Sequence, residues 1–167
     1  RFLPPGDPFL DGLRSLETER LWSLLLTLRD LDIDRPGFST ETEVTREVSI
    51  GALSLSVRLD RLDRLTAGGE LVIDYKTGKF DAGGWKRPRI PESQLPLYAV
   101  SSGCNGVAII QLRPPAARLR GVGDEFLDIP GMKVPAAFFR EEGLDWSGTV
   151  ARWQSQLTKL AGEFAAG

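Results

Sequence analysis

Apolar residues recur every three or four positions near both ends of the chain, a spacing typical of amphipathic helices. Asp7 and Pro8 form a helix-start signal, with Asp as the N-cap and Pro in the first turn. Leucines at this spacing extend the first predicted helix to about Arg29. The same periodicity over residues 146–164 predicts a closing helix.

Between these helices the apolar period changes to two, which is typical of β-strands. Residues 41–50 and 53–60 alternate on either side of Gly51-Ala52, so they are predicted to form a hairpin. A tight turn at residues 67–69 leads into a third strand over residues 70–76. The apolar run of this third strand favours a central place in the sheet.

The second half of the chain has fewer regular patterns. Residues 92–102 predict a helix, and residues 106–112 predict a fourth strand. Residues 77–91, rich in Gly, Pro and basic side chains, predict a surface loop, and residues 114–140 are expected to be irregular with a short strand near Phe126. The order helix, three strands, helix, strand, helix predicts an α/β fold with a mixed sheet flanked by helices.

Length and composition bound what the chain can do. Its 167 residues suffice for one domain with a sizeable core, so residues 1–167 are expected to form a single domain. The chain opens on Arg1 rather than Met, from which we expect a C-terminal fragment of a longer protein. No run of eighteen apolar residues is present, so no membrane span is expected.

The chain has no histidine and a single cysteine, Cys104. Histidine-based triads, histidine zinc sites, internal disulfides and cysteine-rich clusters are therefore excluded within this segment. Catalysis must rely on carboxylates, lysine, tyrosine or a metal held by oxygen. The net charge is −2, whereas dedicated nucleic-acid binders are usually basic, so nucleic acid would be held by a local basic face or by other parts of a larger protein.

Two carboxylates and a lysine are the main candidates for chemistry. Asp60 and Asp74 fall at the ends of two strands joined by a tight turn, and antiparallel neighbours bring such positions within reach of one cation. Lys76 shares a strand face with Asp74, while Tyr75 points to the other face. The pattern indicates metal-dependent hydrolysis of a phosphodiester. Taken alone, each part also fits a surface ion pair or a solvated charged face.

Three motifs together carry a resemblance: Asp60-Arg61-Leu62-Asp63, then Ile73-Asp74-Tyr75-Lys76-Thr77-Gly78, then Gln94-Leu-Pro-Leu-Tyr98. Their order and spacing resemble the PD-(D/E)XK nuclease superfamily, and within it the RecB-type exonuclease branch of bacterial helicase–nuclease and DNA-repair proteins. The resemblance implies a restriction-endonuclease-like core with Mg²⁺ as cofactor and Mn²⁺ as its substitute.

The resemblance also implies roles for individual residues. Asp60 and Asp74 would be metal ligands, the main-chain carbonyl of Tyr75 a third, Lys76 the catalytic lysine, and Gln94 and Tyr98 residues bordering the site. An upstream glutamate is expected as a further ligand, with Glu43 the first choice and Glu47 the second. Two departures from the family pattern are the missing histidine on the first helix and Val57 where glycine is usual. Asp63 is expected to have only a supporting role.

Basic residues after the third strand are the candidates for contact with substrate. They are expected to grip a DNA backbone and, through the tryptophan, to stack a base: Lys79, Trp85, Lys86, Arg87 and Arg89. The alternative is a solubilising loop.

The expected function is a Mg²⁺-dependent deoxyribonuclease of bacterial DNA repair or recombination, cytoplasmic, with exonuclease action favoured over endonuclease action. Its expected partners are DNA and either other domains of the parent protein or a helicase. One alternative is a nuclease-like module, weak or inactive in catalysis, that binds DNA or partner domains. Another is a phosphoesterase acting on a different phosphate ester.

Overall fold

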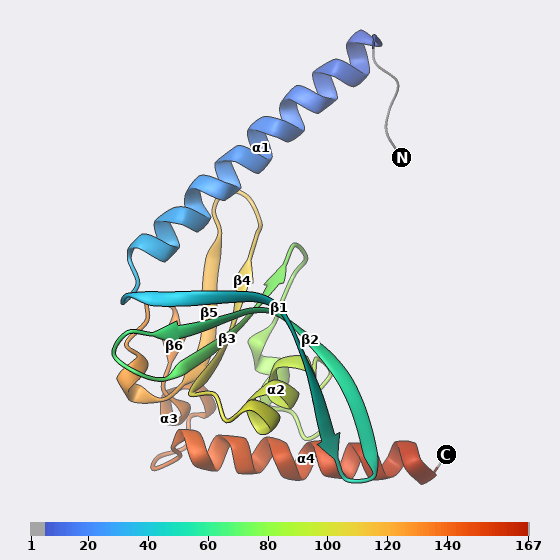
Figure 1. Cartoon of the computed structure of the whole chain (residues 1–167), viewed down its shortest axis with the longest axis vertical. Coiled ribbons are helices and arrows are strands. Elements are labelled where there is room, and N and C mark those ends of the chain that lie inside the picture. The colour runs from blue at the N-terminus through green and yellow to red at the C-terminus, as the bar shows by residue number, and fades with distance from the viewer. Residues whose placement is uncertain (1–5, 167) are drawn as a thin grey trace.

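One six-stranded sheet organises the computed structural model, which describes residues 6–166 (Figure 1). The strands follow one another in sequence order across the sheet: β1 (Phe38–Ile50), β2 (Leu53–Leu65), β3 (Glu70–Lys76), β4 (Gly106–Gln111), β5 (Arg118–Gly123) and β6 (Met132–Lys133). The β3–β4 and β5–β6 pairs are parallel and the others are antiparallel. The mixed α/β sheet is therefore confirmed.

Helices cover this sheet unequally. They are α1 (Pro8–Ile33), α2 (Gln94–Ser102), α3 (Pro135–Phe139) and α4 (Trp146–Ala166), with 3-10 helices η1 (Ala82–Lys86) and η2 (Glu125–Leu127). Helix α2 lies between the sheet and α4, whereas most of α1 projects away from the sheet (Figure 1). Among residues 6–166, no helix has the length and apolarity needed to cross a membrane.

Local signals set the ends of these elements. The carboxylate of Asp7 accepts a hydrogen bond from the Phe9 amide at 2.9 Å, so the predicted N-cap is confirmed, and α1 extends four residues beyond the predicted end to Ile33. The parallel β3–β4 pair requires a crossover, which α2 supplies. Gly103, in the left-handed region at φ 68°, ends that helix.

Strand β3 is buried on both faces, as its apolar run predicted. Val72 packs in one core cluster with Trp85 and Trp153, and Ile73 packs in a second cluster on the opposite face with Leu119. Each of these side chains is at most 5% exposed. The central strand, and with it Asp74 and Lys76, is therefore fixed from both sides.

The segment expected to be irregular contains two strands, so that expectation was wrong. Residues 118–123 form β5 by pairing with β4, with Arg120 opposite Ile109. Tertiary pairing decides here, because a Cβ at Gly121 would lie 2.3 Å from the Met132 sulfur and only glycine fits. Phe126, placed near a strand, lies in η2 and is 50% exposed.

Candidate active site

Strands β2 and β3 part at the two predicted aspartates. Their antiparallel ladder ends at the pair Arg61 and Ile73, and the next positions along it are Asp60 and Asp74. The Asp60 carboxylate accepts a hydrogen bond from the Tyr75 amide at 3.0 Å. A side chain thus replaces a ladder bond, which anchors Asp60 beside β3.

The alternation of side chains shifts at Asp60. Residues three apart on a regular strand face opposite sides, yet Leu59 and Leu62 pack in the same core cluster. On the neighbouring strand Glu43 has a φ of 58° and is skipped in the β1–β2 backbone pairing, although the residues on either side of it remain paired with β2. Such interruptions of a ladder redirect side chains and are common beside active sites.

Asp74 is buried with an incompletely satisfied carboxylate. The residue is 4% exposed, and its Oδ2 atom lies 3.0 Å from the ammonium of Lys76 as an ion pair. No hydrogen bond of good geometry reaches that buried oxygen from the described residues. Burial raises the pKa of Asp74, Lys76 lowers it, and the nearby Asp60 carboxylate raises it again, so that the overall shift is upward.

Lys76 remains positively charged beside these carboxylates. Burial lowers its pKa, but Asp74, Glu92 and Asp60 outweigh burial and raise the pKa above its ordinary value. The side chain therefore supplies an ammonium rather than a free amine at neutral pH. Glu92, which the motifs did not single out, lines the same shallow recess as Asp74 and Lys76. Its place two residues before Gln94 was the only sequence signal for it.

Gln94 and Tyr98 connect α2 to the strand that carries Asp60. Gln94 Nε2 donates to the Tyr98 hydroxyl at 3.0 Å, and that hydroxyl donates to the Arg58 carbonyl at 2.6 Å. Tyr98 is 3% exposed, and its burial raises its pKa. The pair fixes the backbone two residues before Asp60, so both residues are placed to position the site.

The upstream glutamates lie on the exposed hairpin. The Glu43 carboxylate forms a 2.7 Å ion pair with Arg58, and its side chain is 60% exposed, while Glu47 is also exposed. Within residues 6–166, no group of three or more acidic, histidine or cysteine side chains lies together as a metal site. The Asp60 carboxylate is close enough to Asp74 to raise its pKa, and it is held by the Tyr75 amide. The choice between Glu43 and Glu47 stays a prediction.

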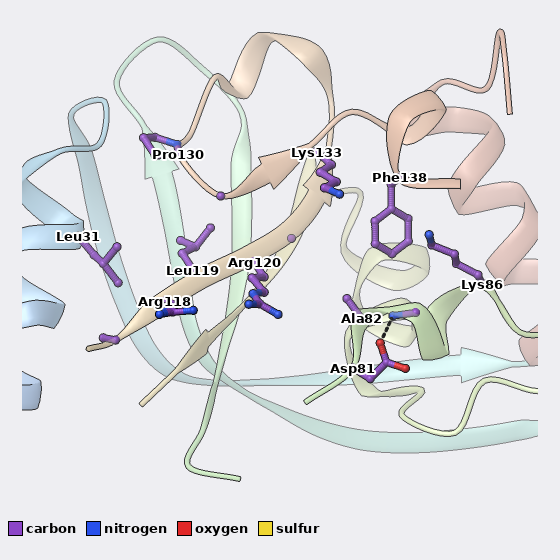
Figure 2. Close-up of a pocket in the computed structure, with 14 residues that line it drawn as sticks. Leu31, Asp81, Ala82, Lys86, Arg118, Leu119, Arg120, Pro130, Lys133 and Phe138 are labelled. Carbon is purple, nitrogen blue, oxygen red and sulfur yellow. Dashed lines mark hydrogen bonds between the residues drawn. The ribbon is translucent and has the colours of Figure 1, made fainter. Parts of the chain in front are cut away.

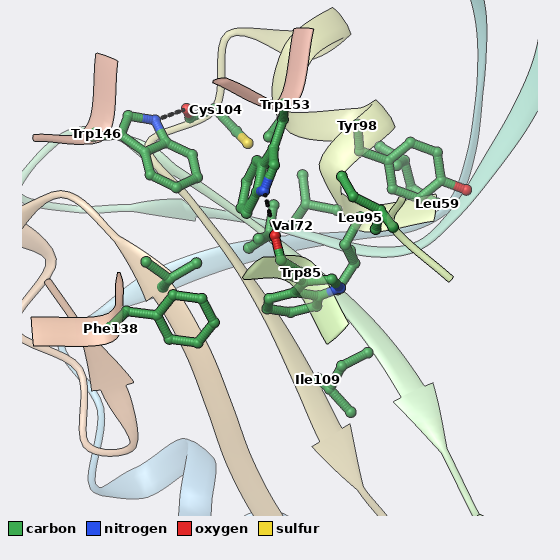
Figure 3. Packing of buried hydrophobic residues seen from close by; sticks show 14 of the residues in the cluster. Leu59, Val72, Trp85, Leu95, Tyr98, Cys104, Ile109, Phe138, Trp146 and Trp153 are labelled. Atoms are coloured by element: carbon green, nitrogen blue, oxygen red, sulfur yellow. Dashed lines mark hydrogen bonds between the residues drawn. The ribbon is translucent and has the colours of Figure 1, made fainter. Parts of the chain in front are cut away.

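Trp85 has a structural position that excludes the predicted stacking on a base. It is 1% exposed and packs against Phe80, Phe138 and Trp153, and its carbonyl accepts a hydrogen bond from the Trp153 indole at 3.1 Å (Figure 3). The large apolar surface of a tryptophan ring favours its burial in the core over exposure. The prediction for Trp85 was therefore wrong.

The basic residues of the same loop point in several directions. Arg89 pairs with Glu163 of α4 at 2.6 Å, and Arg87 lies 3.8 Å from Asp81. The ammonium of Lys86 lies 4.6 Å from the centre of the Phe138 ring. Lys79, three residues beyond Lys76, is exposed. Of the predicted cations, Lys79 and Lys86 therefore lack an acidic partner among the described residues.

The family model of the PD-(D/E)XK nuclease superfamily matches residues 4–162, which include all of these candidate site residues. The chain belongs to the PD-(D/E)XK nuclease superfamily. Nucleases of this superfamily generally use divalent metal ions. The fold, with its mixed sheet and flanking helices, agrees with this membership.

Comparisons with solved structures and with curated sequences give no further assignment. A solved structure described as "Crystal structure of SSO0001" is 18% identical to the chain, with a TM-score of 0.36. The match covers 89% of this chain and 68% of the chain in that structure. No curated protein sequence matches the chain.

Proposed function

We propose that the chain is a Mg²⁺-dependent deoxyribonuclease of the RecB-type branch, acting in bacterial DNA repair or recombination. It would act in the cytoplasm, as an exonuclease, together with other domains or a helicase partner. The observation that supports this proposal most is the position of Asp60, Asp74 and Lys76 beside one another where β2 and β3 part. Superfamily membership supplies the nuclease class.

The residues at this point fit a hard divalent cation. Asp60 and Asp74 offer carboxylate oxygens, and the buried Asp74 Oδ2 pairs with the Lys76 ammonium at 3.0 Å but accepts no hydrogen bond of good geometry from the described residues. These two carboxylates and the carbonyl of Tyr75 would hold the ion, since Mg²⁺ needs only one or two protein carboxylates. Bound there, Mg²⁺ would neutralise phosphate charge and lower the pKa of a coordinated water.

The chain's own residues would orient and neutralise the reacting phosphate. Lys76 is positively charged beside Asp74, where it can stabilise the negative charge that grows during phosphodiester cleavage. The hydrogen bond from the Tyr75 amide keeps Asp60 in place, and the Tyr98 hydroxyl fixes the preceding backbone. The exposed Lys79 is placed to meet the DNA close to the site.

The test is cleavage of single- and double-stranded DNA, labelled at one end or internally, in the presence of Mg²⁺ or Mn²⁺. Asp74→Asn and Lys76→Ala should each lower the rate by about 10²–10³, the usual cost of removing one charge-stabilising group. Glu142→Gln and Lys159→Ala are matched controls at exposed positions, and both should cleave like the parent chain. Release of short end-labelled products would indicate exonuclease action.

Three results would contradict parts of the proposal. Parental cleavage rates in both variants would overturn the assigned site. DNA binding without cleavage by the parent chain would favour the nuclease-like module. Hydrolysis of p-nitrophenyl phosphate in place of DNA would favour a phosphoesterase with another substrate.

A further inference from the structure

A basic groove runs along β5, outside the predicted motifs (Figure 2). Its cavity measures about 660 Å³, and four cationic side chains line it with one carboxylate: Lys86, Arg118, Arg120, Lys133 and Asp81. The carboxylate of Asp81 is already engaged, since it accepts a hydrogen bond from the Gly83 amide and lies 3.8 Å from Arg87. The groove therefore has a clear excess of positive charge.

The cations of this groove differ from most others in the protein. Arg118, Arg120 and Lys133 have no ion pair or hydrogen bond to another side chain within residues 6–166, whereas arginines such as Arg20, Arg64 and Arg89 each pair with a carboxylate. A chain with a net charge of −2 has enough carboxylates to pair these cations as well. The charges left unpaired at β5 are thus available to an anionic ligand.

Strand register places the groove on the same sheet face as the candidate active site. One cross-strand row joins Lys76 through Gln111 to Arg118, and the next joins Asp74 through Ile109 to Arg120. Residues in one row share a face, and two strand spacings amount to about 10 Å. Successive phosphates of one strand are about 3.4 Å apart along the helix axis and farther apart along the strand itself, so this distance spans at most a few nucleotides.

The groove is open because β5 is only partly covered at its outer edge. Strand β6 pairs with Gly121 and Val122 alone, which leaves the Arg118–Arg120 half without a neighbouring strand. The segment of residues 80–86 separates the groove from the recess at Asp74, because Phe80 and Trp85 line the recess while Ala82 and Lys86 line the groove. A polyanion lying across this wall would contact both.

We propose that Arg118, Arg120 and Lys133 bind the phosphodiester backbone of the DNA strand within a few nucleotides of the bond that is cut. This assignment rests on the proposed function in taking DNA as the substrate. The groove supplies position and affinity but no base recognition, since phosphate contacts carry no sequence information directly. A local basic groove of this kind is compatible with DNA binding even though the net charge of the chain is −2.

Binding without cleavage tests the groove separately from the catalytic proposal. The affinity for a fluorescent 20-nucleotide single strand and for the corresponding duplex is measured by anisotropy in EDTA, at several salt concentrations. Arg118→Gln combined with Arg120→Gln should weaken binding by about tenfold and lower the slope of log K against log salt by about 2, uniformly across sequences. Arg20→Gln combined with Lys159→Gln makes the same change in net charge away from the groove and should leave the slope unchanged.

Cross-linking provides a second readout if the double variant misfolds. The only cysteine, Cys104, is 2% exposed, so Arg120→Cys introduces a single accessible thiol for a photoreactive label. Label at position 120 should cross-link to DNA, and label introduced by Lys159→Cys should not. If the groove and control variants have equal DNA affinity and equal salt slope, or if no cross-link forms at position 120, the groove is not the DNA-binding site. A parent chain that binds DNA through the groove but never cleaves it would overturn the catalytic proposal alone.

Discussion

The run from Asp60 to Asp63 contributes one carboxylate to each face of the sheet, and the two faces treat their charges differently. Asp63 is fully buried, and it accepts hydrogen bonds from Arg35 at 2.7 Å, Thr40 at 2.8 Å and Arg61 at 2.7 Å. Arg35 and Arg61 also bind Asp32 at the end of α1. We call this set of residues the Asp63 network.

The sheet face that carries Asp60, Asp74 and Lys76, the candidate active face, pairs its charges less completely. Asp74 is nearly as buried as Asp63, yet its Oδ2 atom has an ion pair with Lys76 and no hydrogen bond of good geometry from residues 6–166. Two carboxylates, Asp60 and Asp74, lie close to one ammonium, that of Lys76. Their negative charge is therefore only partly neutralised by Lys76. Both oxygens of Asp63 are hydrogen-bonded, and this pairing fastens α1 to the sheet, whereas the incompletely satisfied carboxylate of Asp74 still has capacity for a ligand.

The largest expected effect comes from breaking the Asp63 network. Asp63→Asn removes the charge that Arg35 and Arg61 share and leaves buried guanidinium groups without full compensation. We expect unfolding free energy to fall by about 3–5 kcal/mol, the usual cost of breaking a buried ion pair. Urea denaturation followed by circular dichroism measures it.

The control for this experiment is Asp30→Asn, which removes an exposed partner of Arg29 and should change stability by less than about 0.5 kcal/mol. If the two variants unfold at the same urea concentration, the Asp63 network does not hold α1 to the sheet.

Much of this molecule could be predicted from local sequence pattern. The hairpin, β3, the crossover helix and the closing helix followed from apolar periodicity, because each buries one regular face in the core. Asp60 and Asp74 lie where the β2–β3 ladder ends, but both fall within their strands rather than at the predicted strand ends. The superfamily followed from the motifs.

The parts that could not be predicted depend on contacts distant in sequence. Arg118 and Arg120 sit on a short strand with glycines, whose β-structure exists only because β4 pairs with it. One partner of Asp63 is Arg35, 28 residues away, and no periodicity indicates that pair. Trp85 lies among charged residues in sequence but among aromatic rings in space. Each case is decided by tertiary packing rather than local preference.

A smaller effect on stability is expected from Tyr98→Phe, which removes the hydrogen bond to the Arg58 carbonyl beside the candidate active site. Stability should fall by about 0.5–1.5 kcal/mol, while kcat should fall by about 10–100-fold with KM nearly unchanged, because a positioning contact of Asp60 is lost. Steady-state DNA cleavage and urea denaturation measure the two quantities. Ser102→Ala removes another hydrogen bond of α2, to the Tyr98 carbonyl at 2.7 Å, and should reduce stability alone. An equal loss of kcat in both variants would show that Tyr98 acts only through general stability.

The smallest effect has the opposite sign and sharpens the contrast with Asp63. The pKa of Asp74 is raised, first by burial and then by Asp60, and the attraction of Lys76 is already part of that balance. An acid whose folded pKa exceeds its ordinary value of 3.8 favours folding in its protonated form, so that stability is lost as pH rises through the folded pKa. Asp74→Asn should therefore be more stable than the parent chain at pH 7 in EDTA, and the difference should vanish as pH approaches 3.8. Urea midpoints measured between pH 4 and pH 8 provide the comparison. A variant that is less stable than the parent at pH 7 would place Asp74 with Asp63 among the structural carboxylates. A gain in stability would mean that the ionised Asp74 carboxylate lowers the free energy of unfolding of the parent chain, as expected where a bound cation completes the site.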